Sequence, residues 1–355
     1  MSAWLNPLIR SMFTAVSVLP ESWQRRLAGD WPQVDGQRLH TEVALALRLM
    51  NAMPLPSFET LPLSKARRNL DAEAALFGGS TPLPRVEDVS IPAPWGAMPA
   101  RRYEPHAQQP GKALLVYFHG GGFVLGGLAS CDSVCRFIAK HTGVTVLSVD
   151  YRLAPEHPFP AATEDALTAY SFAADVAASW GMGADRLMMG GDSAGGNLCL
   201  SAALQVRDHN RQAAQTGAMP LPRPMLLVPF FPWVDFVGTH RSHQLFAHGY
   251  FLTQAQLAWY TEHYLPNLAD RADPRASLLL HPDLSDIGAC YFGIAGFDPL
   301  RDECLLMAER CQQAGNPVQV DVDSGHVHAY VNATGVGKTG AAALRRACDA
   351  MVARL

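Results

Sequence analysis

Short apolar runs alternate with helical segments along the chain from about residue 80. The runs that we expect to form strands are EDVSIPA (87–93), MPARRYEP (98–105), KALLVYFHG (112–120), VTVLSVDYR (144–152), DRLMMGGDS (185–193), RPMLLVPFF (223–231), CYFGIAGFD (290–298) and NPVQVDVDSG (316–325). Several are apolar throughout, which is typical of strands buried on both faces of a parallel sheet. The last alternates instead, with Val318, Val320 and Val322 between polar residues, and is predicted at a sheet edge. The pattern indicates the α/β class, with a mostly parallel eight-stranded sheet flanked by helices.

Two regions do not follow this alternation. Residues 1–80 read as helices and loops without a motif of their own. Residues 236–270 contain LTQAQLAWYTEHYLPNL, in which Thr253 and Gln256 form a capping box at the start of a predicted helix. Because this second region interrupts the alternation between two strands, we expect it to be an insertion over one end of the sheet.

Composition narrows the classes of partner. The net charge of −4 and the absence of a basic run argue against nucleic acid as a partner. No run of 18 uncharged apolar residues is present, so we expect no membrane span. The apolar start of the chain lacks a basic n-region, which favours an amphipathic accessory helix over a signal peptide. The seven cysteines show no C-x-x-C spacing and lie mostly in apolar contexts, which predicts reduced thiols in a cytoplasmic protein.

The segment RLMMGGDSAGGN contains the most informative chemistry. An apolar run leads directly into Gly191-Asp192-Ser193-Ala194-Gly195, and an Ala/Leu-rich helix follows. Gly-x-Ser-x-Gly between a strand and a helix is typical of a nucleophile elbow, a sharp turn whose flanking positions must lack bulk. The start of the following helix also favours a developing oxyanion.

A second glycine-rich segment, VYFHGGGFVLGG, follows another predicted strand about 70 residues earlier. Its glycines, 120 to 122, offer backbone N–H groups that no Cβ atom obstructs. Two or three such donors about 3 Å from an oxyanion contribute roughly 2.7–4 kcal/mol each to acyl transfer. A flexible loop is the plain alternative.

A nucleophilic serine needs a general base, and the base needs a carboxylate that orients it. Asp298 ends one later strand, and His326 and His328 follow another, in the order typical of α/β-hydrolases. Asp302 and Glu303 compete with Asp298, although acidic residues in a first helical turn usually serve the helix dipole. The residues alone do not distinguish the two histidines.

HGGGF, VDYRLAPEHPFPAA, GDSAGGN, FDPLRDE and HVHAY together resemble the bacterial hormone-sensitive-lipase family of carboxylesterases (family IV), in its GDSAG branch. The matching blocks run from about residue 114 to 332. The resemblance implies an α/β-hydrolase fold with a helical cap, made of an N-terminal segment (1–80) and the insertion (236–270) on a catalytic domain (81–355). It also implies hydrolysis of small carboxylic esters with short to medium acyl chains, without a cofactor.

The resemblance also assigns residues to roles. It implies a triad of Ser193, Asp298 and His328, and an oxyanion hole made by the amides of Gly121, Gly122 and Ala194. Gly325 and Tyr330 frame His328 as the family frames its histidine, and His326 stands where an apolar residue is usual. The chain departs from the family pattern by having Ala329 for glycine and Tyr330 for phenylalanine.

Further positions have weaker assignments. Phe123, Asp192, Phe231 and Trp233 are candidates for the substrate pocket, although ordinary core is the favoured interpretation of each aromatic residue taken alone. VDYRLAPEHPFPAA is interpreted as a structural loop in which Asp150, Arg152 and Glu156 pair with one another and which braces the oxyanion loop or the cap.

Several alternatives remain. His-x-His suits a metal ion, but the sequence shows no third ligand nearby, so no metal is predicted. An amidase, a lactonase or an acyltransferase would use the same triad, and a non-catalytic small-molecule receptor would need none of it. A small ester is the expected partner, and a homodimer is one option for the assembly, which the sequence does not decide.

Overall fold

The strands form one eight-stranded sheet in the order β1-β2-β4-β3-β5-β6-β7-β8. In this computed structural model, which describes residues 11, 15, 18–53, 56–106, 112–183 and 185–355, β2 runs antiparallel to both of its neighbours and the other strands are parallel. The strands are β1 (Arg85–Ala93), β2 (Gly96–Glu104), β3 (Leu114–Phe118), β4 (Thr145–Val149), β5 (Leu187–Asp192), β6 (Leu226–Phe230), β7 (Ala289–Phe297) and β8 (Val318–Val327). The predicted class and strand number are confirmed.

The five strands β3 to β7 are buried at every residue, as their continuous apolar runs predict. β8 lies at the edge, as its alternation predicts. Its burial departs from that alternation at two positions, because Val320 is exposed and Asp323 is buried. The Asp323 carboxylate contacts His40 and Arg346, and these contacts compensate its burial.

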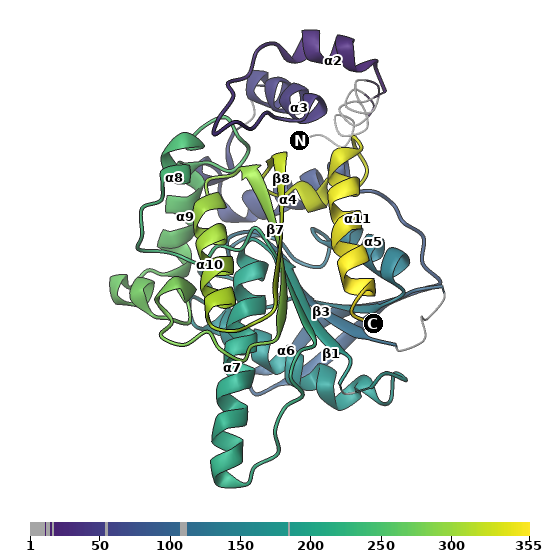
Figure 1. The fold of residues 1–355 in the computed structure, drawn as a ribbon, viewed down its shortest axis with the longest axis vertical. Helices are drawn as coiled ribbons and strands as arrows, with labels where there is room; N and C mark the ends of the chain where they lie inside the picture. Colours follow the sequence, from purple (N-terminus) through teal and green to yellow (C-terminus); the bar gives the residue numbers. More distant parts are fainter. Residues whose placement is uncertain (1–10, 12–14, 16–17, 54–55, 107–111, 184) are drawn as a thin grey trace.

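Helices cover both faces of the sheet (Figure 1). On one face α5 (Asp132–Thr142) and α11 (Thr339–Val352) pack against each other, and on the other lie α6 (Ala161–Ala177), α7 (Ala194–Thr216) and α10 (Arg301–Gln313). Among the described helices, none combines the length and the apolar character that a membrane crossing requires.

The N-terminal segment contains α2 (Glu21–Ala28), α3 (Thr41–Ala52) and α4 (Leu63–Phe77), and the insertion contains α8 (Arg241–Leu245) and α9 (Gln254–Tyr264). Short 3-10 helices complete the described fold: Phe58–Thr60, Leu268–Ala272, Leu278–Leu280 and Tyr330–Asn332. The predicted capping box of α9 is confirmed. Most of the apolar start, predicted to be an amphipathic helix, lies outside the described residues.

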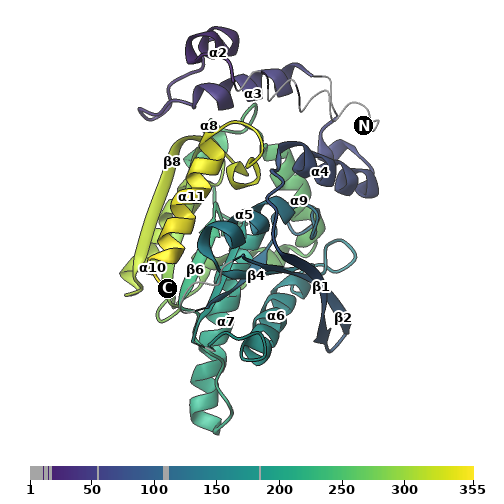
Figure 2. The ribbon, with the colours of Figure 1, turned by 90° about the vertical axis from the view of Figure 1, so that its right-hand side faces the viewer.

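These two segments meet over the end of the sheet toward which β8 points, and Figure 2 shows α2 and α3 lying across that end. The Asn51 side chain donates a hydrogen bond of 3.0 Å to the Gly249 carbonyl, and Gln256 donates one of 3.1 Å to the Ser57 hydroxyl. Parts of the chain about 200 residues apart therefore enclose the carboxyl ends of the central strands.

Candidate active site

Ser193 occupies a strained turn between β5 and α7. Its backbone has φ 57° and ψ −116°, in a region that residues with a side chain rarely adopt. A Cβ atom added to Gly195 would lie 1.9 Å from the Phe118 carbonyl oxygen, so only glycine fits there. The Ser193 amide donates to the Phe230 carbonyl at 2.9 Å. This geometry confirms the predicted elbow.

The Ser193 side chain contacts His328, and His328 contacts Asp298. His328 Nδ1 donates a hydrogen bond of 2.7 Å to the Asp298 carboxylate, and His328 Nε2 accepts one of 2.9 Å from Ser193 Oγ. Asp298 is fully buried at the end of β7, and its second oxygen accepts from the Leu300 amide. A carboxylate bonded to Nδ1 keeps Nε2 free to take a proton.

The competing acidic residues lie elsewhere. Asp302 accepts from the Ser242 amide at 2.8 Å, and buried Glu303 accepts from the Val234 amide at 2.7 Å. Both therefore bind the backbone of the segment after β6. Burial raises the pKa of Glu303 well above its usual range.

The glycine-rich loop after β3 brings its amides to the same turn. Gly121 and Gly122 have φ values of 119° and 61°, which favour glycine. Asp192 holds the loop, because its carboxylate accepts from the Gly120 amide at 3.1 Å and from the Tyr117 hydroxyl at 2.8 Å. Within the described chain, no acceptor is found for the amides of Gly121, Gly122 or Ala194.

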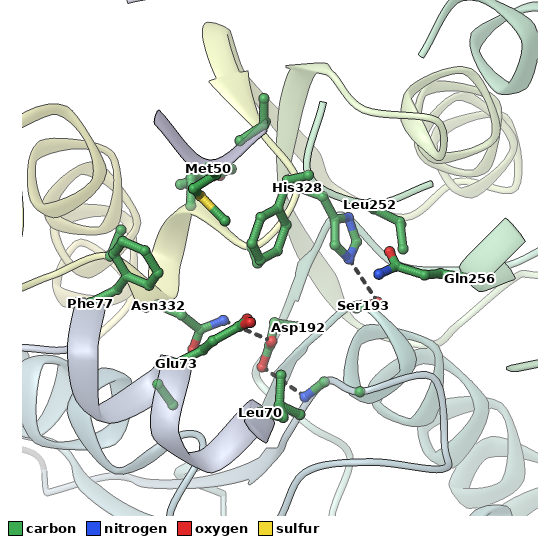
Figure 3. A pocket seen from close by; sticks show the side chains of 18 of the residues that line it. Met50, Leu70, Glu73, Phe77, Asp192, Ser193, Leu252, Gln256, His328 and Asn332 are labelled. Atoms are coloured by element: carbon green, nitrogen blue, oxygen red, sulfur yellow. Dashed lines mark hydrogen bonds between the residues drawn. The ribbon is translucent and has the colours of Figure 1, made fainter. Parts of the chain in front are cut away.

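A mainly apolar cavity of about 410 Å³ opens at Ser193 and His328 (Figure 3). The N-terminal segment and the insertion supply much of its wall. Its lining includes Val43, Leu47, Met50, Leu70, Glu73, Phe77, Leu252, Gln256, Leu257 and Tyr260. A cavity of this size and character suits a small, largely apolar molecule.

Comparison with known proteins agrees with this geometry. Residues 115–332 match a family described by the alpha/beta hydrolase fold. A carboxylic ester hydrolase of Mycobacterium tuberculosis, LipN, is 40% identical over 272 residues, which are 76% of this chain and 70% of the relative. The chain belongs to the hormone-sensitive-lipase family of α/β-hydrolases.

Two further relatives of this α/β-hydrolase support the assignment. An ethyl acetate hydrolase of Pseudomonas putida is 34% identical over 82% of this chain and 92% of its own length. The third protein is an ester hydrolase from the metagenome of Lake Arreo, solved in complex with a bipyridine phosphonate derivative. Its sequence is 34% identical to this chain, and its structure matches with a TM-score of 0.80 over 89% of this chain and 98% of its own. The class of the protein is therefore carboxylic ester hydrolase.

The predicted pocket residues of the hydrolase divide into two pairs. Asp192 and Trp233 line the cavity, whereas Phe123 and Phe231 do not. The Phe123 ring turns into the core and stacks on Tyr264, with ring centroids 3.8 Å apart. The Phe231 ring packs against the His328 ring, with ring centroids 4.6 Å apart. The assignment of these two phenylalanines to the pocket is therefore wrong, because the Phe123 ring packs into the core and the Phe231 ring packs against His328.

Two polar residues of the cavity have no signal in the sequence. Glu73, on α4, faces the cavity near Asn332 and Asp192 (Figure 3), and burial raises the pKa of Glu73 to about 7. Asn332 donates a hydrogen bond of 3.1 Å to the Asp192 carboxylate. Neither residue belongs to a motif, so only the fold identifies them.

His326 lines the same cavity as Ser193 and His328, but its described ring contacts are with other residues. Its side chain is buried, and its ring makes an edge contact with His40 at 5.2 Å. Burial lowers the pKa of His326 to about 4, so the imidazole is neutral at pH 7. The other histidine of HVHAY is the one that reaches the serine.

The loop VDYRLAPEHPFPAA pairs with residues outside itself, so the prediction of internal pairing is wrong. Arg152 forms an ion pair with buried Asp165 at 2.8 Å, and Glu156 forms one with Arg67 of α4 at 2.7 Å. The Arg67 guanidinium lowers the pKa of Glu156. The loop thus connects α6 to the N-terminal segment.

Proposed function

We propose that this protein hydrolyses small carboxylic esters through an acyl-enzyme formed on Ser193, with His328 as general base and Asp298 as the residue that orients it. The continuous hydrogen-bonded chain from Asp298 through His328 to Ser193 is the observation that carries the proposal. It opens into a cavity able to hold an ester.

In the first half-reaction, His328 Nε2 takes the hydroxyl proton as Ser193 Oγ attacks the ester carbonyl carbon. The Asp298 carboxylate stabilises the imidazolium ion that forms. The carbonyl oxygen becomes an anion and accepts from the amides of Gly121, Gly122 and Ala194, each of which contributes roughly 2.7–4 kcal/mol. Collapse of this intermediate, with the proton returned from His328, releases the alcohol.

The second half-reaction uses the same groups on water. His328 takes a proton from a water molecule as its oxygen attacks the acyl-enzyme carbonyl, and the same three amides stabilise the second oxyanion. Protonation of Ser193 Oγ by His328 then releases the carboxylic acid and restores the serine hydroxyl. No step requires a cofactor.

The cavity supports esters with short to medium acyl chains as substrates. Its wall is apolar for most of its area, and its volume of about 410 Å³ lies toward the lower end of small-molecule sites. One of the relatives is named an ethyl acetate hydrolase, which agrees with small substrates.

Residues 1–80 and 236–270 form the cap of this site in the proposed function, over the catalytic domain 81–355. Both segments contribute cavity residues, and side-chain hydrogen bonds join them. The predicted cytoplasmic location agrees with the seven cysteines, all buried and free of disulfide bonds. The homodimer stays a prediction.

A p-nitrophenyl ester series from acetate to decanoate tests the proposal on wild type, Ser193→Ala, His328→Ala and His326→Ala. We expect roughly 10⁴–10⁶-fold losses of kcat for Ser193→Ala and His328→Ala, and a far smaller loss for His326→Ala. Anilides, lactones and an added alcohol acceptor in the same assay measure amide hydrolysis, lactone hydrolysis and acyl transfer. A larger loss for His326→Ala than for His328→Ala would overturn the base assignment, and failure to hydrolyse any ester would overturn the function.

A further inference from the structure

His326 is a buried histidine that the proposed ester hydrolysis does not use. Its side chain is 4% exposed, and its Nε2 atom has no hydrogen-bond partner in the described part of the chain. A buried ring nitrogen without a partner is costly, so such an atom in a native site calls for an explanation.

Two further ligand-type side chains lie beside the His326 ring. His40, the residue before α3, has its Nε2 atom 2.8 Å from a carboxylate oxygen of Asp323, which lies on β8. One potential ligand atom from each of His40, Asp323 and His326 lies within 4.8 Å of the other two. His40 and Asp323 are 283 positions apart in the chain, and the cluster includes only one histidine of HVHAY, because His328 contacts Ser193 and Asp298 instead.

The backbone fixes His40 beside β8. The His40 amide donates a hydrogen bond of 2.9 Å to the Gly325 carbonyl, between the other two residues of the cluster. The His40 ring packs over Gly325, where an added Cβ atom would lie 2.7 Å from the ring. The absence of a Cβ atom at position 325 lets the His40 ring lie close to the backbone between Asp323 and His326.

Arg346 holds the Asp323 carboxylate in place, and the His40 side of the cluster is open to solvent. The second oxygen of Asp323 accepts a hydrogen bond of 3.0 Å from Arg346, which also binds Asp321 at 2.8 Å. Such an outer contact orients a ligating carboxylate. The side chain of His40 is 38% exposed, so solvent reaches the cluster from that side.

Two imidazoles and one carboxylate are the ligand set of many zinc sites that keep a fourth position for water. Zn–N and Zn–O distances of about 2.0–2.2 Å place tetrahedral ligand atoms roughly 3.3 Å apart. The His40–Asp323 pair therefore opens by about 0.5 Å, and the longest separation closes by up to about 1.5 Å. The partly exposed His40 ring is the member of the cluster with the most room to move.

We propose that His40, Asp323 and His326 bind one divalent transition-metal ion of the zinc class, with water as the fourth ligand. The ion joins the start of α3 to the edge strand β8. Because α3 contributes Val43, Leu47 and Met50 to the cavity wall, the ion fixes one wall of the pocket. It contacts neither Ser193 nor Asp298, so its role is to hold the cap segment in place.

Metal binding is measured on the full-length protein after dialysis against EDTA and then against buffer. Equilibrium dialysis with Zn²⁺ and elemental analysis give stoichiometry and affinity, and Co²⁺ titration gives the visible absorption of a tetrahedral site. The ligand variants are His40→Ala, Asp323→Asn and His326→Gln. Asp321→Asn is the matched control, because it lies on the same strand and binds the same arginine.

We expect one equivalent of Zn²⁺ in wild type and in Asp321→Asn, and at least about tenfold weaker binding in each ligand variant. Zn²⁺ should raise the melting temperature of wild type and Asp321→Asn and leave that of His40→Ala unchanged. Because His40 is partly exposed, that variant is expected to fold, which circular dichroism checks.

Ser193→Ala separates this inference from the proposed function, because it removes the nucleophile and should still bind one equivalent of metal. Sub-stoichiometric binding by wild type would overturn the site. Equal binding by wild type and the three ligand variants would overturn it as well.

Discussion

The fully buried Asp298 carboxylate lies 2.7 Å from Nδ1 of His328 and fixes the orientation of the imidazole. The same ring then presents Nε2 to Ser193 Oγ at 2.9 Å. Asp298 therefore reaches the serine only through the histidine, and in the proposed mechanism it selects the ring orientation and the tautomer in which Nε2 accepts.

Asp298→Asn should lower kcat by about 10⁴-fold, because an amide that donates to Nδ1 places the proton of a neutral imidazole on Nε2. KM should change little, since Asp298 does not line the cavity. Steady-state kinetics with p-nitrophenyl butyrate measures the effect. Asp302→Asn is the control, and a loss for it as large as for Asp298→Asn would contradict the assignment of the acid.

Asp192→Ala should impair the glycine-rich loop after β3, which supplies two amides of the proposed oxyanion hole. The carboxylate is the acceptor for the Gly120 amide, the Tyr117 hydroxyl and the Asn332 side chain, so its removal leaves polar groups without partners. We expect a stability loss of about 1–3 kcal/mol and a fall in kcat of up to about 10²-fold as the amides shift. Urea unfolding and kinetics at saturating ester measure the two effects. A kcat equal to that of wild type for every ester of the chain-length series would contradict this role.

Glu73→Gln should change how stability depends on pH. Burial raises the pKa of Glu73 in the folded protein from 4.5 to about 7, so folding favours the protonated form. The stability that this carboxyl contributes is present below about pH 4.5 and is lost as the pH rises toward 7. Glutamine does not titrate. The melting temperature of the variant minus that of wild type should therefore increase as the pH rises from 5 to 8.

The control for this prediction is Glu262→Gln, which alters an exposed glutamate on α9. Its melting temperature relative to wild type should stay constant over the same pH range. A constant difference for Glu73→Gln too would show that Glu73 is ionised at pH 5 in the folded protein.

Ala329→Gly should stabilise the loop that contains His328. Ala329 has φ 64°, a left-handed conformation that costs a residue with a Cβ atom roughly 1–2 kcal/mol. Glycine removes this cost. Its greater conformational freedom in the unfolded chain lowers the free energy of unfolding by roughly 0.4–1 kcal/mol. The net gain should be about 1 kcal/mol in the free energy of unfolding, measured with urea. Ala333→Gly, at φ −90°, should instead destabilise the protein.

The local parts of the site could be predicted from the sequence. The elbow around Ser193 and the loop around Gly121 are short motifs whose glycines are required by nearby backbone, so the pattern itself contains the geometry. Asp298 and His328 each follow a strand, and parallel strands bring their carboxyl ends to one edge of the sheet. The eight strands could also be predicted, because the spacing of apolar residues along each segment is itself a local feature of the sequence.

Relationships between distant segments could not be predicted. The direction of the Phe123 ring depends on where α9 places Tyr264, and the partner of Glu156 is Arg67 of α4. Glu73 and His40 belong to segments without motifs, and only their packing over the sheet brings them to the cavity and to β8. These contacts depend on tertiary structure, which periodicity does not encode.

Covalent labelling of Ser193 tests the central claim most directly. Wild type, Ser193→Ala and His328→Ala are incubated with a p-nitrophenyl alkylphosphonate, and intact-protein and peptide mass spectrometry locate the adduct. We predict one adduct per wild-type chain on the peptide that contains Ser193, with parallel loss of esterase activity. We also predict no adduct in Ser193→Ala and much slower labelling in His328→Ala. An adduct on another residue, or esterase activity that survives full labelling of Ser193, would contradict the mechanism.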